Sequence, residues 1–155
     1  MEKTKQDILS LFNAIDQLGH LKGVKFTYGI ARNINILKPE VESLQEAAKQ
    51  SEDFTAYEKS RLEILEKYAE KDKDGKSVIK NNEYVISDRK SFDKAFKKLR
   101  SENKKTLDDR QVQLKEVEKL LKEESTIKFH KIKVDDVPED ITTAQMNSIF
   151  ALIDE

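Results

Sequence analysis

The sequence predicts a mainly α fold: a long antiparallel helical hairpin with a small β-hairpin at its tip, then a C-terminal strand and a short helix. Three observations predict it. Apolar residues recur at helical spacing over two long stretches, Gly (4) and Pro (2) are scarce, and charged residues make up 38% of the chain. Ordinary globular domains carry roughly 25% charged residues. We expect residues 1–155 to form a single domain with much helical surface for its core.

Composition excludes several classes of protein. The absence of Cys excludes disulfides, cysteine-zinc sites and thiol catalysis. A formal net charge of -1 provides no overall attraction to nucleic acid or anionic lipid. No apolar run approaches the roughly 20 residues that span a bilayer, and Met1 is not followed by the apolar region of a signal peptide. We therefore expect a soluble protein that is made inside a cell and has no membrane partner.

Residues 1–23 predict a short helix and a turn. The helix extends from Thr4 to Leu18, and Gly19 and Gly23 bracket the turn that follows it. Its apolar face has spacings of three and four residues: Ile8, Leu11, Phe12, Ile15 and Leu18. The turn allows this helix to fold back onto the next one.

Residues 24–70 predict the first arm of the hairpin. Pro39 removes a backbone hydrogen bond and should kink or divide the arm, and Ser51 or Asp53 should cap a new helix after a second break. Val24–Tyr28 alternates well enough for a strand, although helix is the preferred interpretation. The apolar stripe consists of Phe26, Ile30, Ile34, Leu37, Val41, Leu44, Phe54, Tyr57, Leu62, Leu65 and Tyr68.

Residues 71–87 predict a turn and a β-hairpin. Strands at Ser77–Lys80 and Tyr84–Ser87 flank a pair of asparagines, Asn81-Asn82, and asparagine tolerates positive φ. Asp72 and Glu83 have the first-to-twelfth spacing of a calcium loop. The loop also needs glycine at its sixth position and oxygen ligands throughout, and this sequence provides neither. A solvated turn without metal is the better interpretation.

Residues 88–124 predict the second arm, capped by Asp88. Leu107, Leu114 and Leu121 recur every seven residues, as in a coiled coil, and an unbroken helix here would be about 55 Å long. Antiparallel pairing of the arms should place Tyr68 close to Phe92. It should also place Ile34 or Val41 close to Leu114 or Leu121.

Residues 125–155 predict a strand and a short helix that fold back near the first helix. Alternation over Thr126–Val134 predicts the strand, and Thr142 with Gln145 forms the capping box of the helix. We expect His130 to be an exposed strand residue. The apolar face of the last helix consists of Met146, Ile149, Phe150 and Ile153.

Three polar residues on or near the apolar stripes are candidates for an interaction site. Arg61, Asn103 and Arg110 either snorkel at helix edges, with Asn103 setting the register, or form a polar layer in the arm pair or at a partner interface. Arg110 interrupts the stripe that contains Leu107 and Leu114, so part of that stripe is open to a partner helix.

A basic patch on the second arm is a weaker candidate. It contains Lys94, Lys97, Lys98, Lys104 and Lys105, together with Arg100. Phosphates could bind here. Asp93, Glu102, Asp108 and Asp109 lie among or beside these cations and no stacking series of aromatic residues accompanies them, which favours a solvated helix face over a nucleic-acid site.

No catalytic, cofactor-binding or metal-binding set can be assigned. His20 and His130 lack neighbours at metal-ligand spacing. The chain also lacks a nucleophile elbow, a glycine-rich phosphate loop and a distinctive acid–base pair. We therefore expect no cofactor, no metal and no enzymatic activity.

The segment Val24–Leu37, with the pattern K-F-x-Y-x-I-A-R-N, resembles a segment of a conserved, uncharacterised family of small bacteriophage proteins. The order of features is also similar: Tyr57 and Arg61 in a charged helix, a K-D-x-x-G turn at Lys71, H-K-I at His130 and I-T-x-x-Q-M at Ile141. The resemblance implies phage origin, gene clusters that often contain morphogenesis genes, and a non-enzymatic role.

Together these features predict a phage protein-interaction module that acts in virion assembly or as a structural component, in the virion or the host cytoplasm. It would bind a protein partner or a second copy of itself. The alternatives are a small effector that inhibits a host defence protein and, more weakly, a nucleic-acid-binding protein that uses the basic patch.

Overall fold

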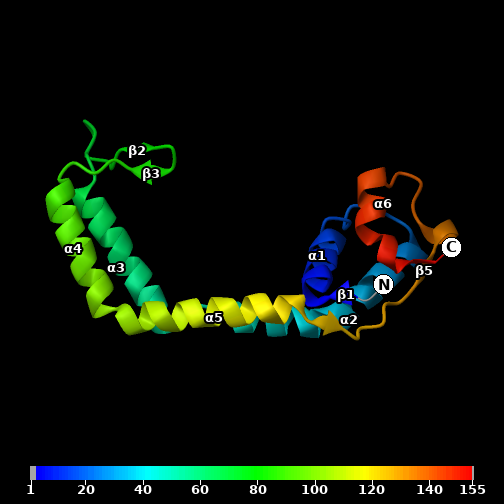
Figure 1. Ribbon diagram of the computed structural model, residues 1–155. Coiled ribbons are helices and arrows are strands. Elements are labelled where there is room, and N and C mark those ends of the chain that lie inside the picture. The colour runs from blue at the N-terminus through cyan, green and yellow to red at the C-terminus, as the bar shows by residue number, and fades with distance from the viewer. Residues whose placement is uncertain (1–2, 155) are drawn as a thin grey trace. The chain divides into compact units, whose positions relative to one another are not determined.

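A computed structural model describes residues 3–154, which form two compact units. The first unit contains residues 3–48 and 115–154, and the second contains Lys49–Leu114. The fold is mainly α with small strand pairs, as predicted (Figure 1). None of the described helices combines the length and apolar character needed to cross a membrane. A single domain over residues 1–155 stays a prediction.

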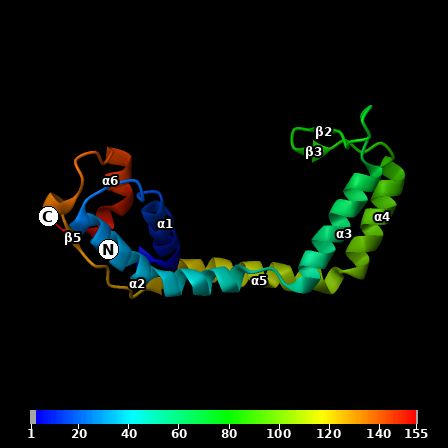
Figure 2. The same ribbon diagram turned by 180° about the vertical axis from the view of Figure 1, so that it is seen from behind.

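The first unit brings the two ends of the sequence together around one core. Helix α1 (Lys5–Asp16) packs on α2 (Val24–Ala48) and on α6 (Thr143–Ile149), which continues into the 3-10 turn η2 (Phe150–Leu152) (Figure 2). The predicted return of the C-terminal segment to the first helix is confirmed. The core consists of Ile8, Leu11, Ile15, Leu18, Leu21, Phe26, Leu37, Val41, Ile132, Ile149, Leu152 and Ile153.

Local signals set the helix ends of this unit. Thr4 caps α1 in a capping box: Asp7 N donates to its hydroxyl oxygen at 3.2 Å, and Thr4 N donates to the Asp7 carboxylate at 2.8 Å. Gly23, with φ of 138°, precedes the first residue of α2, where helix was preferred to strand. Thr142 and Gln145 form the predicted capping box of α6.

Pro39 lies inside α2 and does not divide it. In a regular helix the N–H of residue 39 would donate to the carbonyl of Asn35. Asn35 and Pro39 are both exposed, so water can reach the carbonyl that the proline leaves without a partner. The helix therefore continues to Ala48.

Short strand pairs close the first unit. β1 (Lys3–Thr4) pairs antiparallel with β4 (Glu124–Ser125), and β5 (Ile132–Lys133) pairs parallel with β6 (Ile153–Asp154). The predicted strand over Thr126–Val134 is wrong for most of its length, since only β5 is strand and the 3-10 turn η1 (Val134–Asp136) follows. The alternation of apolar and polar residues indicates only which side chains face inward. A strand also needs hydrogen-bonded partners, and β1 and β6 provide these only at the two ends.

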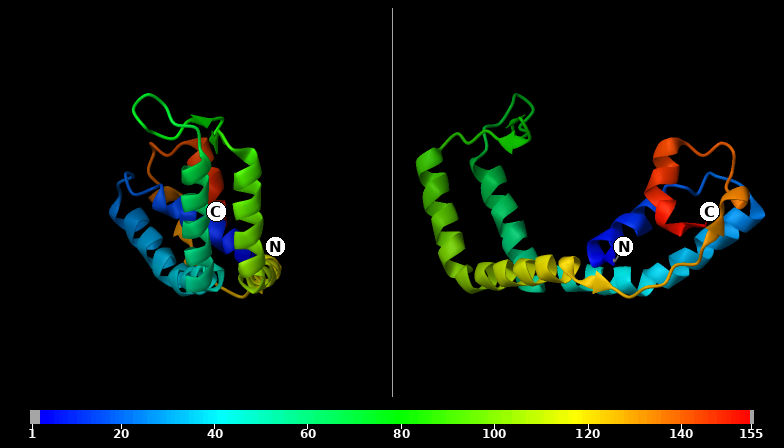
Figure 3. Two further views of the ribbon diagram at one scale, coloured as in Figure 1. Left: turned by 90° about the vertical axis from the view of Figure 1, so that its left-hand side faces the viewer. Right: turned by 45° about the vertical axis from the view of Figure 1, so that its right-hand side comes forward.

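The second unit contains an antiparallel helix pair. α3 (Glu52–Tyr68) and α4 (Arg89–Glu102) lie side by side (Figure 3), and the rings of Tyr68 and Phe92 are 6.3 Å apart, as the predicted near-turn contact requires. Ser51 caps α3 by accepting from Phe54 N at 3.1 Å. The first arm is therefore two helices, α2 and α3, separated at the predicted second break.

A small β element connects α3 to α4. β2 (Ile79–Lys80) and β3 (Glu83–Tyr84) form the predicted hairpin, with φ of 51° at Asn81 and 63° at Asn82. Asp72 accepts from Asp74 N and Lys76 N, both at 2.9 Å, and so closes the preceding turn. Over residues 3–154 no cluster of three or more His, Cys, Asp or Glu is placed to hold a metal ion.

The second arm is not the single helix that was predicted. Asn103, with φ of −109° and ψ of 21°, separates α4 from α5 (Lys104–Lys122). Its side-chain amide donates to the carbonyl of Leu99 at 2.9 Å, and its own backbone N–H donates to the same oxygen at 3.1 Å. The backbone bond is the ordinary helical one, but the side-chain bond competes with the regular helix, so Asn103 marks a break in the arm.

Candidate functional site

The polar candidates from the sequence lie in the second unit, and each has its own partner there. Arg61 pairs with Glu58, one turn earlier on α3, with an N–O distance of 2.9 Å. The guanidinium of Arg110 lies 5.4 Å from the ring centroid of Phe54 and donates to Gln113 at 2.6 Å. Asn103 forms the break described above. An interface role for these residues stays a prediction.

The leucine stripe on α5 is partly open. Leu114 is 50% exposed, its neighbour Val112 is 55% exposed, and Leu107 is half-buried. No residue of α5 is fully buried. Part of the stripe is therefore available to a partner helix, although contact of Leu114 or Leu121 with Ile34 or Val41 stays a prediction.

The basic patch is interrupted by carboxylates. Lys98 lies 3.8 Å from Glu102 and Lys105 lies 2.9 Å from Asp109, whereas Lys94, Lys97 and Lys104 are exposed. The hydrogen bond that Lys105 donates to the Asp109 carboxylate raises the pKa of Lys105 above its ordinary value. These acidic neighbours reduce the local positive charge, which favours a solvated face over a phosphate site.

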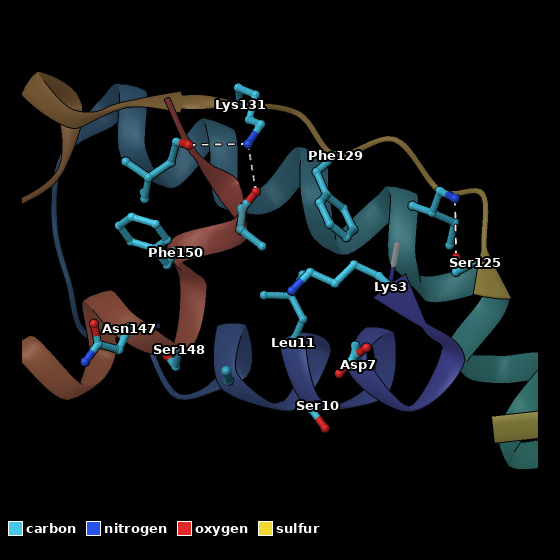
Figure 4. A pocket seen from close by; sticks show the side chains of 14 residues that line it. Lys3, Asp7, Ser10, Leu11, Ser125, Phe129, Lys131, Asn147, Ser148 and Phe150 are labelled. Atoms are coloured by element: carbon cyan, nitrogen blue, oxygen red, sulfur yellow. Dashed lines mark hydrogen bonds between the residues drawn. The ribbon is translucent and has the colours of Figure 1, made fainter. Parts of the chain in front are cut away.

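An open groove of about 850 Å³ in the first unit was not predicted from the sequence. Its walls are α1, the extended residues 125–131 and the end of α6 with η2 (Figure 4). Leu11 and Ile153 are buried at its base, and Phe129 and Phe150 project their rings into it. This is a concave, partly apolar surface with polar groups around it, as binding sites commonly are.

Phe150 corrects one expectation about the last helix. It was assigned to the buried apolar face, but it is 57% exposed and lines the groove, while Leu152 is fully buried in its place. The helix tightens from α to 3-10 geometry after Ile149, and three residues per turn shift the inward positions relative to the 3.6-residue pattern.

Charged groups occupy two sides of the groove. Lys131 Nζ donates to the carbonyls of Ala151 at 3.0 Å and Ile153 at 3.4 Å, and the side chain of Lys3 extends into the groove (Figure 4). The pKa of Asp7 lies below its ordinary value because the backbone N–H and then the hydroxyl of Thr4 donate to the carboxylate. Asp7 is thus ionised at neutral pH and held in the helix cap.

Two of the three serine hydroxyls that line the groove, those of Ser10 and Ser148, are bonded to their own helices, and the third, that of Ser125, accepts from Ile127 N. Ser10 donates to the carbonyl of Gln6 at 2.9 Å, and Ser148 donates to the carbonyl of Gln145 at 2.7 Å. Neither hydroxyl donates to a general base, which nucleophilic catalysis by serine requires. The arrangement is suited to recognition of a ligand.

The extended wall of the groove is fixed from behind by α2. Asn33, which is fully buried, donates from Nδ2 to the carbonyl of His130 at 2.8 Å, and His130 N donates to Asn33 Oδ1 at 2.9 Å. The ring of His130 stands edge-on to Tyr28 with centroids 6.2 Å apart. His130 is half-buried in an extended segment, so its prediction as an exposed strand residue is wrong.

The main chain of this wall is open in its middle. Ile127 N donates to the side chain of Ser125 at 3.3 Å. Within the part of the chain that the structure describes, the peptide groups of Lys128 and Phe129 have no backbone hydrogen-bond partner. Successive peptide groups of an extended chain point to opposite sides, so one of these two residues can bond another extended chain on a given side.

No protein-family model, curated protein or solved structure matches this chain. The sequence contained one signal for the groove, since Ile127, Phe129 and Lys131 alternate onto one side of the extended segment. The facing wall comes from residues more than a hundred positions away in α1, which a local pattern cannot reveal.

Proposed function

We propose that this chain is a non-enzymatic, phage-encoded protein-interaction module that acts in virion assembly or as a structural component. The open groove of the first unit is the observation that supports the proposal most. It combines a buried apolar base, the exposed ring of Phe150 and a stretch of main chain that has no backbone partner among residues 3–154. Apolar surface surrounded by polar groups is typical of protein-binding sites.

The chemistry of the groove favours binding over reaction. Its carboxylate, Asp7, is held in a helix cap, and its hydroxyls at Ser10 and Ser148 donate to carbonyls of their own helices. General acid–base and nucleophilic catalysis both need such groups directed at each other or at a substrate. A nucleic-acid role has less support, because two lysines of the basic patch are paired with carboxylates.

Affinity capture of the tagged full chain from infected cells tests the proposal. The comparison uses wild type, Ser10→Glu and Asn13→Glu, because both positions are exposed on α1 and only Ser10 lines the groove. We expect wild type and Asn13→Glu to capture a virion protein and Ser10→Glu to capture at least about fivefold less, equivalent to ~1 kcal/mol.

Two results would count against the proposal. Enrichment of no virion protein by the wild-type chain would contradict the assembly role, and specific capture of a host defence protein in its place would favour inhibition of the host. Equal capture by Ser10→Glu would show that the partner binds elsewhere on the molecule.

A further inference from the structure

Residues 124–133 pair with strands at both ends. Between these ends, the peptide groups of Lys128 and Phe129 have no backbone partner within residues 3–154. β1 pairs with β4 at one end, and β6 pairs with β5 at the other. In Figure 4 the arrows of both partners lie on the groove side of the extended segment. On the side toward α2, the side chain of Asn33 forms hydrogen bonds with the N–H and the carbonyl of His130. The open stretch therefore lies between two short strands, beside the groove.

We propose that the groove binds an extended acidic peptide segment of the protein partner, laid along residues 126–129 between β1 and β6. The inference rests on the proposed function, since it assumes that the partner is a protein. Addition of a strand to an open main-chain edge is a common mode of peptide recognition. At about 3.3 Å per residue, a few residues of peptide would fill the gap.

The backbone provides the first argument for an extended ligand. The peptide groups of Lys128 and Phe129 have no backbone partner within residues 3–154, although the residues on either side are held by Asn33 and Ser125. The two ends of this stretch are thus already fixed before a ligand binds. A strand placed beside it would gain main-chain hydrogen bonds without ordering a loop first.

The rings of Phe129 and Phe150 provide the second argument. Both line the groove, and Phe150 is 57% exposed although it follows directly on a fully buried residue, Ile149. An apolar side chain of the peptide would cover these rings and the neighbouring Leu11. Removal of this apolar surface from water would favour binding.

Charge provides the third argument and specifies the peptide as acidic. Lys3 and Lys131 line the groove against one carboxylate, Asp7, which is held by Thr4. Two hydrogens of the Lys131 ammonium group donate to carbonyls, and an ammonium group has three. A third donor is therefore available, and an Asp or Glu of the peptide would be preferred there to a Lys or Arg.

The test is a selection from a library of displayed random peptides of about ten residues against the immobilised full chain. We expect enrichment of peptides that combine Asp or Glu with apolar residues. One enriched peptide is then synthesised with a fluorophore and titrated by anisotropy. The variants are Phe150→Ala, Lys3→Gln and Ser10→Glu, with Asn13→Glu as the matched control.

Each groove variant should weaken binding of that peptide by about five- to tenfold, the size of a single contact, while Asn13→Glu should not. Bound peptide should also slow hydrogen exchange at the amides of residues 126–129. Circular dichroism checks that each variant is folded. If Phe150→Ala unfolds, the exposed substitution Ser10→Glu and the charge substitution Lys3→Gln decide the outcome.

Three results would overturn the inference: no enriched peptide, enrichment of basic peptides, or an enriched peptide that binds the groove variants as well as wild type. The proposed function would still stand in each case if affinity capture recovers a virion protein. If affinity capture fails and the selected acidic peptide still occupies the groove, the assembly role is wrong and the peptide site is retained.

Discussion

Asn33 and His130, which are 97 positions apart, are joined by two hydrogen bonds: Asn33 Nδ2 donates to His130 O at 2.8 Å, and His130 N donates to Asn33 Oδ1 at 2.9 Å. A side-chain amide has the same donor and acceptor as a peptide group, so a helical residue acts here as the partner of an extended chain. Their contact holds the segment around His130 against α2.

Asn33→Ala should destabilise the protein by about 1–2 kcal/mol, because it removes the fully buried amide and leaves the partly buried peptide groups of His130 without these partners. Urea unfolding measures the change. Asn35→Ala is the matched control on the same helix, since Asn35 is exposed, and its effect should stay within about 0.5 kcal/mol. Equal effects of the two substitutions would show that the Asn33 amide contributes little.

Gly29→Ala should also destabilise the protein. A Cβ at this position would lie 2.7 Å from Cγ1 of Ile132, which is buried, and the overlap should cost about 1–3 kcal/mol despite the better helix propensity of alanine. The measurement is the urea midpoint. Gly19→Ala serves as the control, because its nearest contact would be the Asp16 carbonyl at 3.9 Å.

Ile132→Ala should make Gly29→Ala more tolerable, because it removes the atoms that the new Cβ would meet. The double variant should therefore be more stable than the sum of the two single changes predicts. Strict additivity would place the cause of the Gly29→Ala effect somewhere other than this contact.

Asp7 should stabilise the protein at neutral pH and lose this effect in acid. Hydrogen bonds from Thr4 lower the folded-state pKa of Asp7 below its model-compound value of 3.8. A lowered folded pKa gives stability that is fully present above the unfolded pKa and is lost as pH falls through the folded pKa. Asp7→Asn should thus be less stable than wild type at about pH 6, and the difference should shrink as the pH falls below the unfolded pKa of 3.8.

Thermal melts of wild type and Asp7→Asn across this pH range test that expectation. The side chain is largely exposed, so solvent screening should keep the difference to about 0.5 kcal/mol. A difference that grows as the pH falls would reverse the expected sign, and the capping hydrogen bonds would then not be its source.

Leu114→Glu should leave folding intact and weaken association with a partner or a second copy, because Leu114 is 50% exposed on α5. Leu107→Glu should cost more stability, because Leu107 is half-buried. Melting temperature and mass by light scattering distinguish the two effects. Unfolding of both variants would assign the stripe to the internal core, and unchanged mass and partner binding would exclude this face as an interface.

Helix positions could be predicted wherever a cap and an apolar stripe occur together. Thr4 stands at the expected start of α1, Ser51 is one of the two expected caps of α3, Thr142 caps α6 as expected, and Asn81-Asn82 forms the expected hairpin turn. In these cases residues within a few positions of each other determine the backbone conformation. The preference for helix over strand at Val24–Tyr28 is confirmed for the same reason.

The errors arose where distant contacts decide the structure or where a local bond has two interpretations. Asn103 was expected to set the register or to form a polar layer, but its side chain bonds the carbonyl of Leu99 where the helix breaks. The alternation over Thr126–Val134 could not show that Asn33 takes the place of a neighbouring strand. The groove needs α1 and residues 125–131 together, so no single segment of the sequence predicts it.

The first unit is built from two segments that lie far apart in the sequence. This determines the order in which the two units can fold during synthesis. Lys5 bonds Glu123 across 118 positions, whereas the second unit is the continuous stretch Lys49–Leu114. During synthesis from the N-terminus, the second unit is complete first and the core around α1 must wait for residues 132–153. Until then the apolar face of α1 can pack on α2 but lacks the cover that Ile132 and α6 provide. A ribosome that stalls between these points would present that face to chaperones and proteases.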